Sequence, residues 1–127
     1  MNIKVLSIDY KGRLLILSDY GEFCAFWGDS ELPEIGKRYD VELDIPYRYS
    51  LSEIDISNRQ QPLIYSAGMK TYIVGKIESY EDRILCLRMD NSIFLIETVE
   101  DSTFCKLINQ YVTITTDQLF VYNTNML

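Results

Sequence analysis

The chain has 127 residues, of which 47% are hydrophobic and 13% aromatic, and its formal net charge is −7. This length suits a single domain, and the hydrophobic content is too high for a disordered chain. The negative charge disfavours nucleic acid as a partner, since phosphate binding draws on Lys and Arg, and it favours a basic protein partner. An acidic charge is also common in proteins that carry it for solubility alone.

No histidine occurs anywhere in the sequence. This excludes Ser-His-Asp and Cys-His catalysis and His-bearing metal sites. The three cysteines, Cys24, Cys86 and Cys105, lack the spacing of a zinc motif, and no glycine-rich phosphate loop follows a strand. We therefore expect a protein that is not an enzyme and needs no metal or cofactor.

The same sequence indicates where the protein works. The N-terminus lacks the charged and apolar regions of a signal peptide, and no apolar stretch is long enough for a membrane span. Cys24 and Cys86 lie in apolar runs, where reduced cysteines act as small hydrophobic residues. These features predict a cytoplasmic protein with core thiols and no membrane partner. They give no indication of an oligomeric state.

The first part of the chain predicts an antiparallel meander. Residues 2–9, 13–18 and 23–27 are apolar runs separated by short polar turns. Trp27 ends the third run. A loop with Gly and Pro as breakers follows, and it carries three acids, Asp29, Glu31 and Glu34.

The next strand has the clearest alternation in the chain. Its acidic residues alternate with aliphatic ones: Asp40, Glu42 and Asp44 with Val41, Leu43 and Ile45. Because successive side chains of a strand point to opposite faces, the three carboxylates should line one face at intervals of about 6.6–7 Å. Such a face is solvated, neutralised by Lys or Arg, or available to a basic ligand.

Residues 47–70 are the least regular part of the sequence. Tyr47, Tyr49 and Leu51 alternate as in an edge strand, Ser50 is suited to cap a short helix, and residues 63–65 form a short apolar run. A segment of this length between two meanders is either a binding loop or a connector.

From residue 71 the strand pattern resumes. Residues 71–79, 83–89 and 92–98 predict three further strands, with a bulge or bend at Gly75. Residues 102–108 predict one or two helical turns. Residues 111–116 and 119–122 predict a closing hairpin, followed by a tail at 123–127. A second acidic group lies before the helical turns: Glu97, Glu100 and Asp101.

The two halves follow one plan. The run Arg13–Leu17 recurs in pattern as Arg83–Leu87, and each is preceded by a tyrosine with a short charged turn. We predict an all-β barrel or sandwich of two similar antiparallel meanders, with lobes at about 1–46 and 71–127 around the 47–70 insertion. Internal duplication is a hypothesis here, because any two meanders share such features.

Small size, strong acidity, a Tyr-rich β scaffold and the absence of catalytic residues resemble the immunity proteins of bacterial polymorphic-toxin and contact-dependent growth inhibition systems. Those proteins bind a cognate toxin domain, often a basic nuclease, and block its active site. The resemblance concerns general character and includes no motif, so it implies no site residues. It implies a non-catalytic inhibitor that docks an acidic surface over a basic toxin.

In that interpretation the acidic strand supplies the main contact, in place of the substrate's phosphates: Asp40, Glu42 and Asp44. The loop acids extend it (Asp29, Glu31 and Glu34), and three aromatic residues are candidate anchors (Tyr47, Tyr49 and Trp27). The rival surface is the second acidic group, Glu97, Glu100 and Asp101. The alternative function is an OB-like oligonucleotide-binding barrel or a small β adaptor, although the few Lys and Arg residues do not cluster as an oligonucleotide groove requires.

Overall fold

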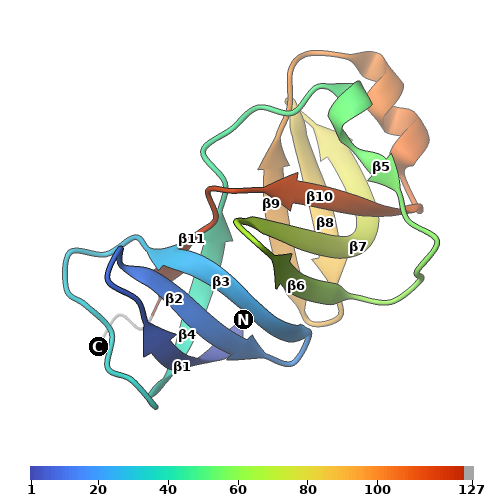
Figure 1. Ribbon diagram of the computed structural model, residues 1–127. Coiled ribbons are helices and arrows are strands. Elements are labelled where there is room, and N and C mark those ends of the chain that lie inside the picture. Colours follow the sequence, from blue (N-terminus) through green and yellow to red (C-terminus); the bar gives the residue numbers. More distant parts are fainter. Residues whose placement is uncertain (125–127) are drawn as a thin grey trace.

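The computed structural model describes residues 1–124 and is almost entirely β-structure (Figure 1). These residues form eleven strands and two short 3-10 helices: β1 (Asn2–Ile8), β2 (Arg13–Ser18), β3 (Gly21–Trp27), β4 (Arg38–Asp44), η1 (Leu51–Glu53), β5 (Asp55–Ile56), β6 (Leu63–Ala67), β7 (Lys70–Glu81), β8 (Ile84–Met89), β9 (Ser92–Glu97), η2 (Ser102–Leu107), β10 (Tyr111–Thr116) and β11 (Phe120–Asn123). The predicted all-β class is confirmed. Of the predicted tail, residues 125–127 lie outside the described residues.

The first lobe is a closed five-stranded barrel with the strand order β1-β2-β3-β11-β4, at the lower left of Figure 1. β1, β2 and β3 form the predicted meander, and β4 pairs with the free edge of β1. Alternate side chains of these strands fill the barrel and are buried, among them Ile3, Val5, Leu14, Ile16 and Phe23. The alternation that buries these residues places the polar residues of β4 on the outside.

The second lobe is a sheet with the order β5-β10-β7-β8-β9, at the upper right of Figure 1. Its longest strand, β7, has 12 residues. The first half of β7 pairs with β6, and its second half pairs with β8 on the same edge, while β10 occupies the opposite edge. β6 also lies beside β3 and joins the two lobes.

The two meanders share one pairing register. The β1–β2 ladder has a bulge at Val5–Ser7, and the β7–β8 ladder has one at Ile77–Ser79. The next pair of strands repeats as well, since Ile16 lies opposite Phe23 in the barrel and Leu87 lies opposite Phe94 in the sheet. The repeated pattern of the sequence therefore corresponds to a repeated strand arrangement.

The turn that leads into the strand beside the first strand of each meander, β4 beside β1 and β10 beside β7, is repeated too. Gly36 has a φ of 85° before β4, and Asn109 has a φ of 70° before β10. Each donates its backbone N–H at 2.7 Å to the residue that begins the bulge, Gly36 to Val5 and Asn109 to Ile77. A left-handed conformation suits glycine and is tolerated by asparagine, so each residue fits its position.

Each lobe is completed by a segment from the other half of the chain. β11 follows β10 in sequence but pairs antiparallel with β4 and parallel with the end of β3. In the other direction, the chain leaving β4 places Tyr49 beside Thr98, after the end of β9, again in parallel. The backbone hydrogen bonds of the two crossing segments correspond. After β3, Gly28 N–H donates to Val121 O at 2.8 Å, and after β9, Val99 N–H donates to Tyr49 O at 2.9 Å. We call this arrangement the strand exchange.

The strand exchange corrects one prediction. Residues 119–122 were expected to return beside 111–116 as a hairpin, and this is wrong, because β11 joins the barrel. Without β11, β3 and β4 would each present a row of unpaired backbone groups, whereas one strand placed between them pairs with both. The barrel therefore contains residues from outside 1–46. The last strand of residues 71–127, β11, belongs to the barrel and not to the second lobe.

Two glycines mark close contacts of the backbone. A Cβ on Gly21 would lie 2.5 Å from the carbonyl oxygen of Ile64, where β3 and β6 join the lobes. A Cβ on Gly75 would lie 2.8 Å from the side chain of Leu87 and 2.9 Å from the carbonyl oxygen of Arg88. Gly75 is thus needed for close approach to β8, and the bulge predicted at Gly75 lies instead at Ile77–Ser79.

Residues 47–70 are more regular than the sequence indicated. Ser50 precedes η1, and its N–H donates to the Glu53 carboxylate at 2.8 Å, as a helix-capping residue would. The apolar run at 63–65 is a strand, β6, that begins at Leu63 and extends to Ala67. The segment is therefore a structured connection between the lobes.

Candidate functional site

The acidic strand has the arrangement that its sequence predicts. In β4, Tyr39 and Val41 are buried in the barrel, while Asp40, Glu42 and Asp44 are exposed on its outer face. β4 lies between β1 and β11, so this face continues onto two neighbouring strands. We call these three carboxylates the acidic ladder.

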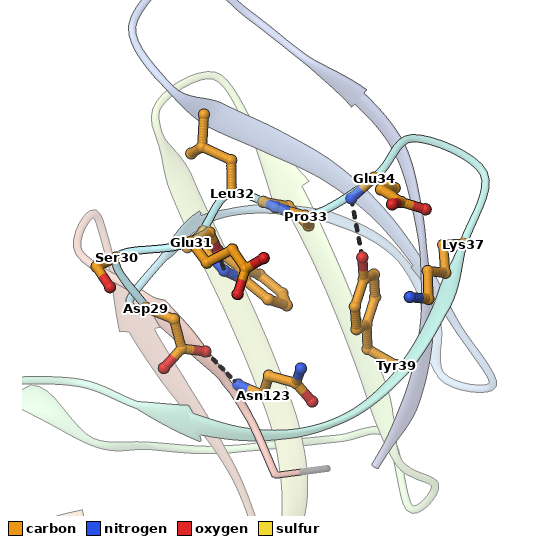
Figure 2. Close-up of a pocket in the computed structure, with 10 residues that line it drawn as sticks. Asp29, Ser30, Glu31, Leu32, Pro33, Glu34, Lys37, Tyr39 and Asn123 are labelled. Atoms are coloured by element: carbon orange, nitrogen blue, oxygen red, sulfur yellow. Dashed lines mark hydrogen bonds between the residues drawn. The ribbon is translucent and has the colours of Figure 1, made fainter. Parts of the chain in front are cut away.

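The loop between β3 and β4 surrounds a pocket of about 380 Å³, shown in Figure 2. Three predicted acids and the predicted aromatic anchor line it together: Asp29, Glu31, Glu34 and Trp27. Lys37, Tyr39 and Asn123 complete the wall with Ser30, Leu32 and Pro33. We call this the loop pocket.

Hydrogen bonds to the two aromatic residues hold the loop in place. The Trp27 indole donates from Nε1 to the carbonyl oxygen of Glu31 at 2.7 Å, and the backbone N–H of Glu34 donates to the Tyr39 hydroxyl at 2.8 Å. Figure 2 shows the second of these bonds, with the Tyr39 ring rising from β4 toward the loop. The acids of the loop are thereby fixed relative to the barrel.

The aromatic residues of the loop pocket form a wall suited to a cation. The rings of Trp27 and Tyr39 meet edge to face, with centroids 5.1 Å apart and planes at 63°. The ammonium group of Lys37 already lies 5.4 Å from the centroid of Tyr39. Aromatic faces and carboxylates both attract ammonium and guanidinium groups, so a Lys or Arg side chain is the ligand that this chemistry favours.

The end of β11 links the loop pocket to the acidic ladder. Asn123 donates its backbone N–H to the Asp29 carboxylate at 2.7 Å (Figure 2). The next residue, Thr124, donates both its N–H and its hydroxyl to the carbonyl oxygen of Asp40, each at 2.9 Å. The two predicted acidic groups therefore lie on either side of one strand end.

Tyr47 and Tyr49 differ in their exposure. Tyr47 is 48% exposed and donates its hydroxyl to the Glu53 carboxylate, whereas Tyr49 is 3% exposed and donates its hydroxyl to the carbonyl oxygen of Thr115 at 2.6 Å. Their rings meet edge to face at 4.9 Å. Tyr47 keeps surface for a partner, while Tyr49 belongs to the core.

Burial raises the pKa of Tyr49 to about 12. A phenol whose pKa is raised on folding contributes stability that is complete below its unfolded pKa of about 10 and is lost as the pH rises through its folded pKa. We therefore expect the Tyr49→Phe variant to lose about 1 kcal/mol at neutral pH, through the lost hydrogen bond. Between about pH 10 and pH 12 its stability should fall less steeply than that of the wild type.

Urea unfolding at several pH values measures this difference. Tyr10→Phe is the matched control, because Tyr10 is 92% exposed. The control should follow the wild-type pH dependence, so parallel curves for all three proteins would show that burial of Tyr49 has no part in the alkaline loss of stability.

The three acids of the second acidic group differ in their contacts. Glu97 and Glu100 are exposed, but Asp101 caps η2 by accepting the backbone N–H of Thr103 at 2.9 Å. The bonds from Thr103 lower the pKa of Asp101. Two of the three acids therefore remain at the surface for a partner, Glu97 at the end of β9 and Glu100 in the loop that follows it.

The sequence did not single out a groove between the lobes. The groove has a volume of about 610 Å³, with acids of the ladder on one wall and apolar side chains of the second sheet on the other. Its lining residues are Glu42, Leu43, Asp44, Cys86, Ile93, Leu95 and Tyr122. The unbroken apolar run from Ile93 to Ile96 is the one sequence feature that points to an apolar wall here, and in the sequence alone it predicts only a strand. We call this cavity the interlobe groove.

The cysteines remain free thiols in the structure. Cys24 and Cys86 are half-buried in β3 and β8, and Cys105 is exposed on η2. Cys86 lines the interlobe groove, and burial raises the pKa of its thiol.

A scan against protein-family models, a search of curated proteins and a search of solved structures each returned no match to this chain. Within residues 1–124, no helix has the length and apolar character required to cross a membrane. The same residues bring together no group of three or more His, Cys, Asp or Glu side chains that could hold a metal ion.

Proposed function

We propose that this protein binds a basic protein partner and inhibits it without catalysing a reaction. In its specific form, the proposal is that the chain is a cytoplasmic immunity protein whose partner is a cognate toxin, a basic nuclease. The observation that carries it is the presence of two carboxylate groups that meet at the end of β11 through Asp29 and Asp40: Asp29, Glu31 and Glu34 around the loop pocket and Asp40, Glu42 and Asp44 along the outer face of β4.

Charge and rigidity both support this use of the surface. Lys37 is the only basic residue among those that line the loop pocket, against three acids. The loop is held by the bonds of Trp27 and Tyr39, so little ordering is required when a partner binds. Carboxylates on a fixed scaffold complement the Lys and Arg side chains with which a nuclease holds phosphates.

The proposed mechanism is occlusion. A Lys or Arg side chain of the partner enters the loop pocket between the acids and the Trp27–Tyr39 wall, and the ladder meets further basic residues around it. The complex then covers the cleft where the partner binds nucleic acid. Long-range attraction between the two charged surfaces accelerates the encounter, and this acceleration weakens as salt screens the charges.

The test is affinity capture from the source cells at low salt, followed by titration of the captured protein with the purified chain. We expect one basic protein at near-equal stoichiometry, whose activity is abolished at a one-to-one ratio. The variant Asp29→Lys/Glu31→Lys/Glu34→Lys should bind that protein at least about tenfold more weakly, since several opposite-charge contacts become like-charge ones.

The control variant carries the same change in net charge at exposed acids that do not line the loop pocket: Asp19→Lys, Glu81→Lys and Asp117→Lys. It should retain most of the binding. Equal losses in the two variants would mean that net charge alone matters and would remove the loop pocket from the proposal. Capture of RNA or single-stranded DNA in place of a protein would favour the oligonucleotide-binding alternative.

A further inference from the structure

The loop pocket already contains one cation, the side chain of Lys37. Its ammonium group lies over the Tyr39 ring, 5.4 Å from the centroid, and Figure 2 shows it pointing toward that ring. Tyr39 is only 7% exposed, whereas Lys37 is exposed to solvent. Lys37 therefore covers an aromatic surface that a cation from a partner would otherwise contact.

The acids of the loop do not neutralise this ammonium group. Within residues 1–124 the one ion pair joins Arg88 to Glu78, so Lys37 is held by an aromatic ring and not by a carboxylate. The carboxylates of Glu31 and Glu34 likewise have no hydrogen-bond or ion-pair partner among these residues. The loop pocket thus keeps two acids available to a second cation.

The backbone of Lys37 is fixed, but its side chain is not. Lys37 N–H donates to the carbonyl oxygen of Glu34 at 3.3 Å, and Val5 N–H donates to the carbonyl oxygen of Lys37 at 3.2 Å. The side chain makes no hydrogen bond within residues 1–124, and its four-carbon stem is flexible. The ammonium group can therefore leave the ring without disturbing the turn before β4.

We propose that Lys37 is an internal competitor for the cation site of the loop pocket, and that the partner displaces its ammonium group with an arginine side chain. Two cations beside one ring repel each other, so the ammonium group must move before another cation binds there. A guanidinium group gains more from this exchange, because it is planar, stacks on aromatic rings and directs several N–H donors to carboxylates. A lysine from the partner would only replace one ammonium group with another.

This inference rests on the proposed function for the identity of the partner, but its binding chemistry can be tested without the partner. The probes are arginine, lysine and citrulline, each blocked by an N-acetyl group and a C-terminal methylamide. Citrulline has nearly the shape of arginine without its charge. Trp27 is the only tryptophan of the chain, and its ring meets that of Tyr39, so its fluorescence and its indole N–H resonance report on the loop pocket.

The three probes should bind the full chain in a definite order at low salt. We expect blocked arginine to bind with a Kd of about 1 mM, as befits a single side chain in a shallow site. Blocked lysine should bind about twofold to fivefold more weakly, because it lacks the planar group that stacks and forms paired hydrogen bonds. Blocked citrulline should bind at least about tenfold more weakly, because it has no charge for the acids to attract.

Two matched variants test the competition. Lys37→Met removes the ammonium group and keeps an unbranched side chain, whereas Lys11→Met makes the same change at a lysine that lies 5.6 Å from the Tyr10 ring and outside the loop pocket. We expect Lys37→Met to bind blocked arginine about twofold to fivefold more tightly than the wild type does, the range expected for one exposed cation–π contact. Lys11→Met should bind as the wild type does. Circular dichroism spectra and urea midpoints establish that both variants are folded.

Equal or weaker binding of blocked arginine by Lys37→Met would overturn the proposal, and so would blocked arginine that binds no more tightly than blocked citrulline. These results are separable from the fate of the proposed function. A captured partner that binds Lys37→Met as it binds the wild type, but does not bind Asp29→Lys/Glu31→Lys/Glu34→Lys, would support inhibition while rejecting Lys37 as a competitor. The expected order of probes, together with a captured partner that binds this triple variant normally, would support the cation site while rejecting it as the inhibitory contact.

Discussion

A chain divided between Gly68 and Met69 is expected to fold only when both fragments are present. The cut lies in the exposed turn between β6 and β7, so it removes no buried contact directly. The fragment 1–68 would lack β11, which closes the barrel, and the fragment 69–127 would lack Tyr49, which joins the end of β9. Each fragment should be largely unfolded alone, because neither can complete its sheet or bury its core.

Mixing the two fragments should restore the native circular dichroism spectrum and cooperative unfolding. The matched control replaces the second fragment with 69–117, which keeps β7 to β10 and lacks β11 and the residues on either side of it. That mixture should fail to form the barrel. A stable folded signal from fragment 1–68 by itself would contradict the strand exchange as a requirement for folding.

The Gly21→Ala variant is expected to be the most destabilised of the glycine variants. Gly21 has a φ of 129°, which disfavours a side chain, and its added Cβ would lie 2.5 Å from the backbone carbonyl oxygen of Ile64. A backbone atom cannot move aside as a flexible side chain can, so β3 and β6 must separate. We expect a loss of at least about 2 kcal/mol in the free energy of unfolding.

The control for this variant is Gly12→Ala. Gly12 also has a positive φ, 80°, but a Cβ there would have no atom within 4 Å. It should lose about 1 kcal/mol, from the backbone conformation alone. Urea unfolding of both variants separates the two effects, and equal losses would mean that the contact between β3 and β6 adds nothing to stability.

Local patterns in the sequence were sufficient for much of the fold. The alternation of Asp40, Glu42 and Asp44 with aliphatic residues predicts which face of β4 is exposed, because side-chain direction in a strand depends only on position. Ser50 predicts the short helix that begins at Leu51. The likeness of Arg13–Leu17 to Arg83–Leu87 identifies β2 and β8, which occupy matching places in the two meanders. The strands themselves match Ile16 with Leu87, one residue away from the match in the sequence.

The errors arose where contacts between distant segments decide the structure. Nothing in residues 119–122 distinguishes a hairpin strand from one that pairs with β4, since the choice depends on which edges elsewhere are unpaired. Alternation treats Tyr47 and Tyr49 alike, yet only Tyr49 reaches the core, because its segment crosses to the second lobe. The apolar run of residues 93–96 predicts a strand but does not show which of its side chains are covered, and Ile93 and Leu95 are exposed.

The candidate site was likewise predicted in part, where local patterns sufficed. The sequence identified the acids and Trp27 as partner-binding candidates, and the structure places four of these residues around one pocket. It gave no reason to include Tyr39, which faces the barrel yet forms the pocket wall with Trp27. The pairing of two rings from β3 and β4 depends on the barrel closing, which no single segment encodes.

The position of β11 in the chain also sets the order in which the protein can mature on the ribosome. β1 to β4 emerge first, but the edges of β3 and β4 have no mutual partner until residues 120–123 have been synthesised. The nascent barrel therefore remains an open sheet until residues 120–123 have left the ribosome. Long-range pairing of this kind slows folding and exposes edges to aggregation, so chaperone binding should concentrate on chains that have not yet acquired β11.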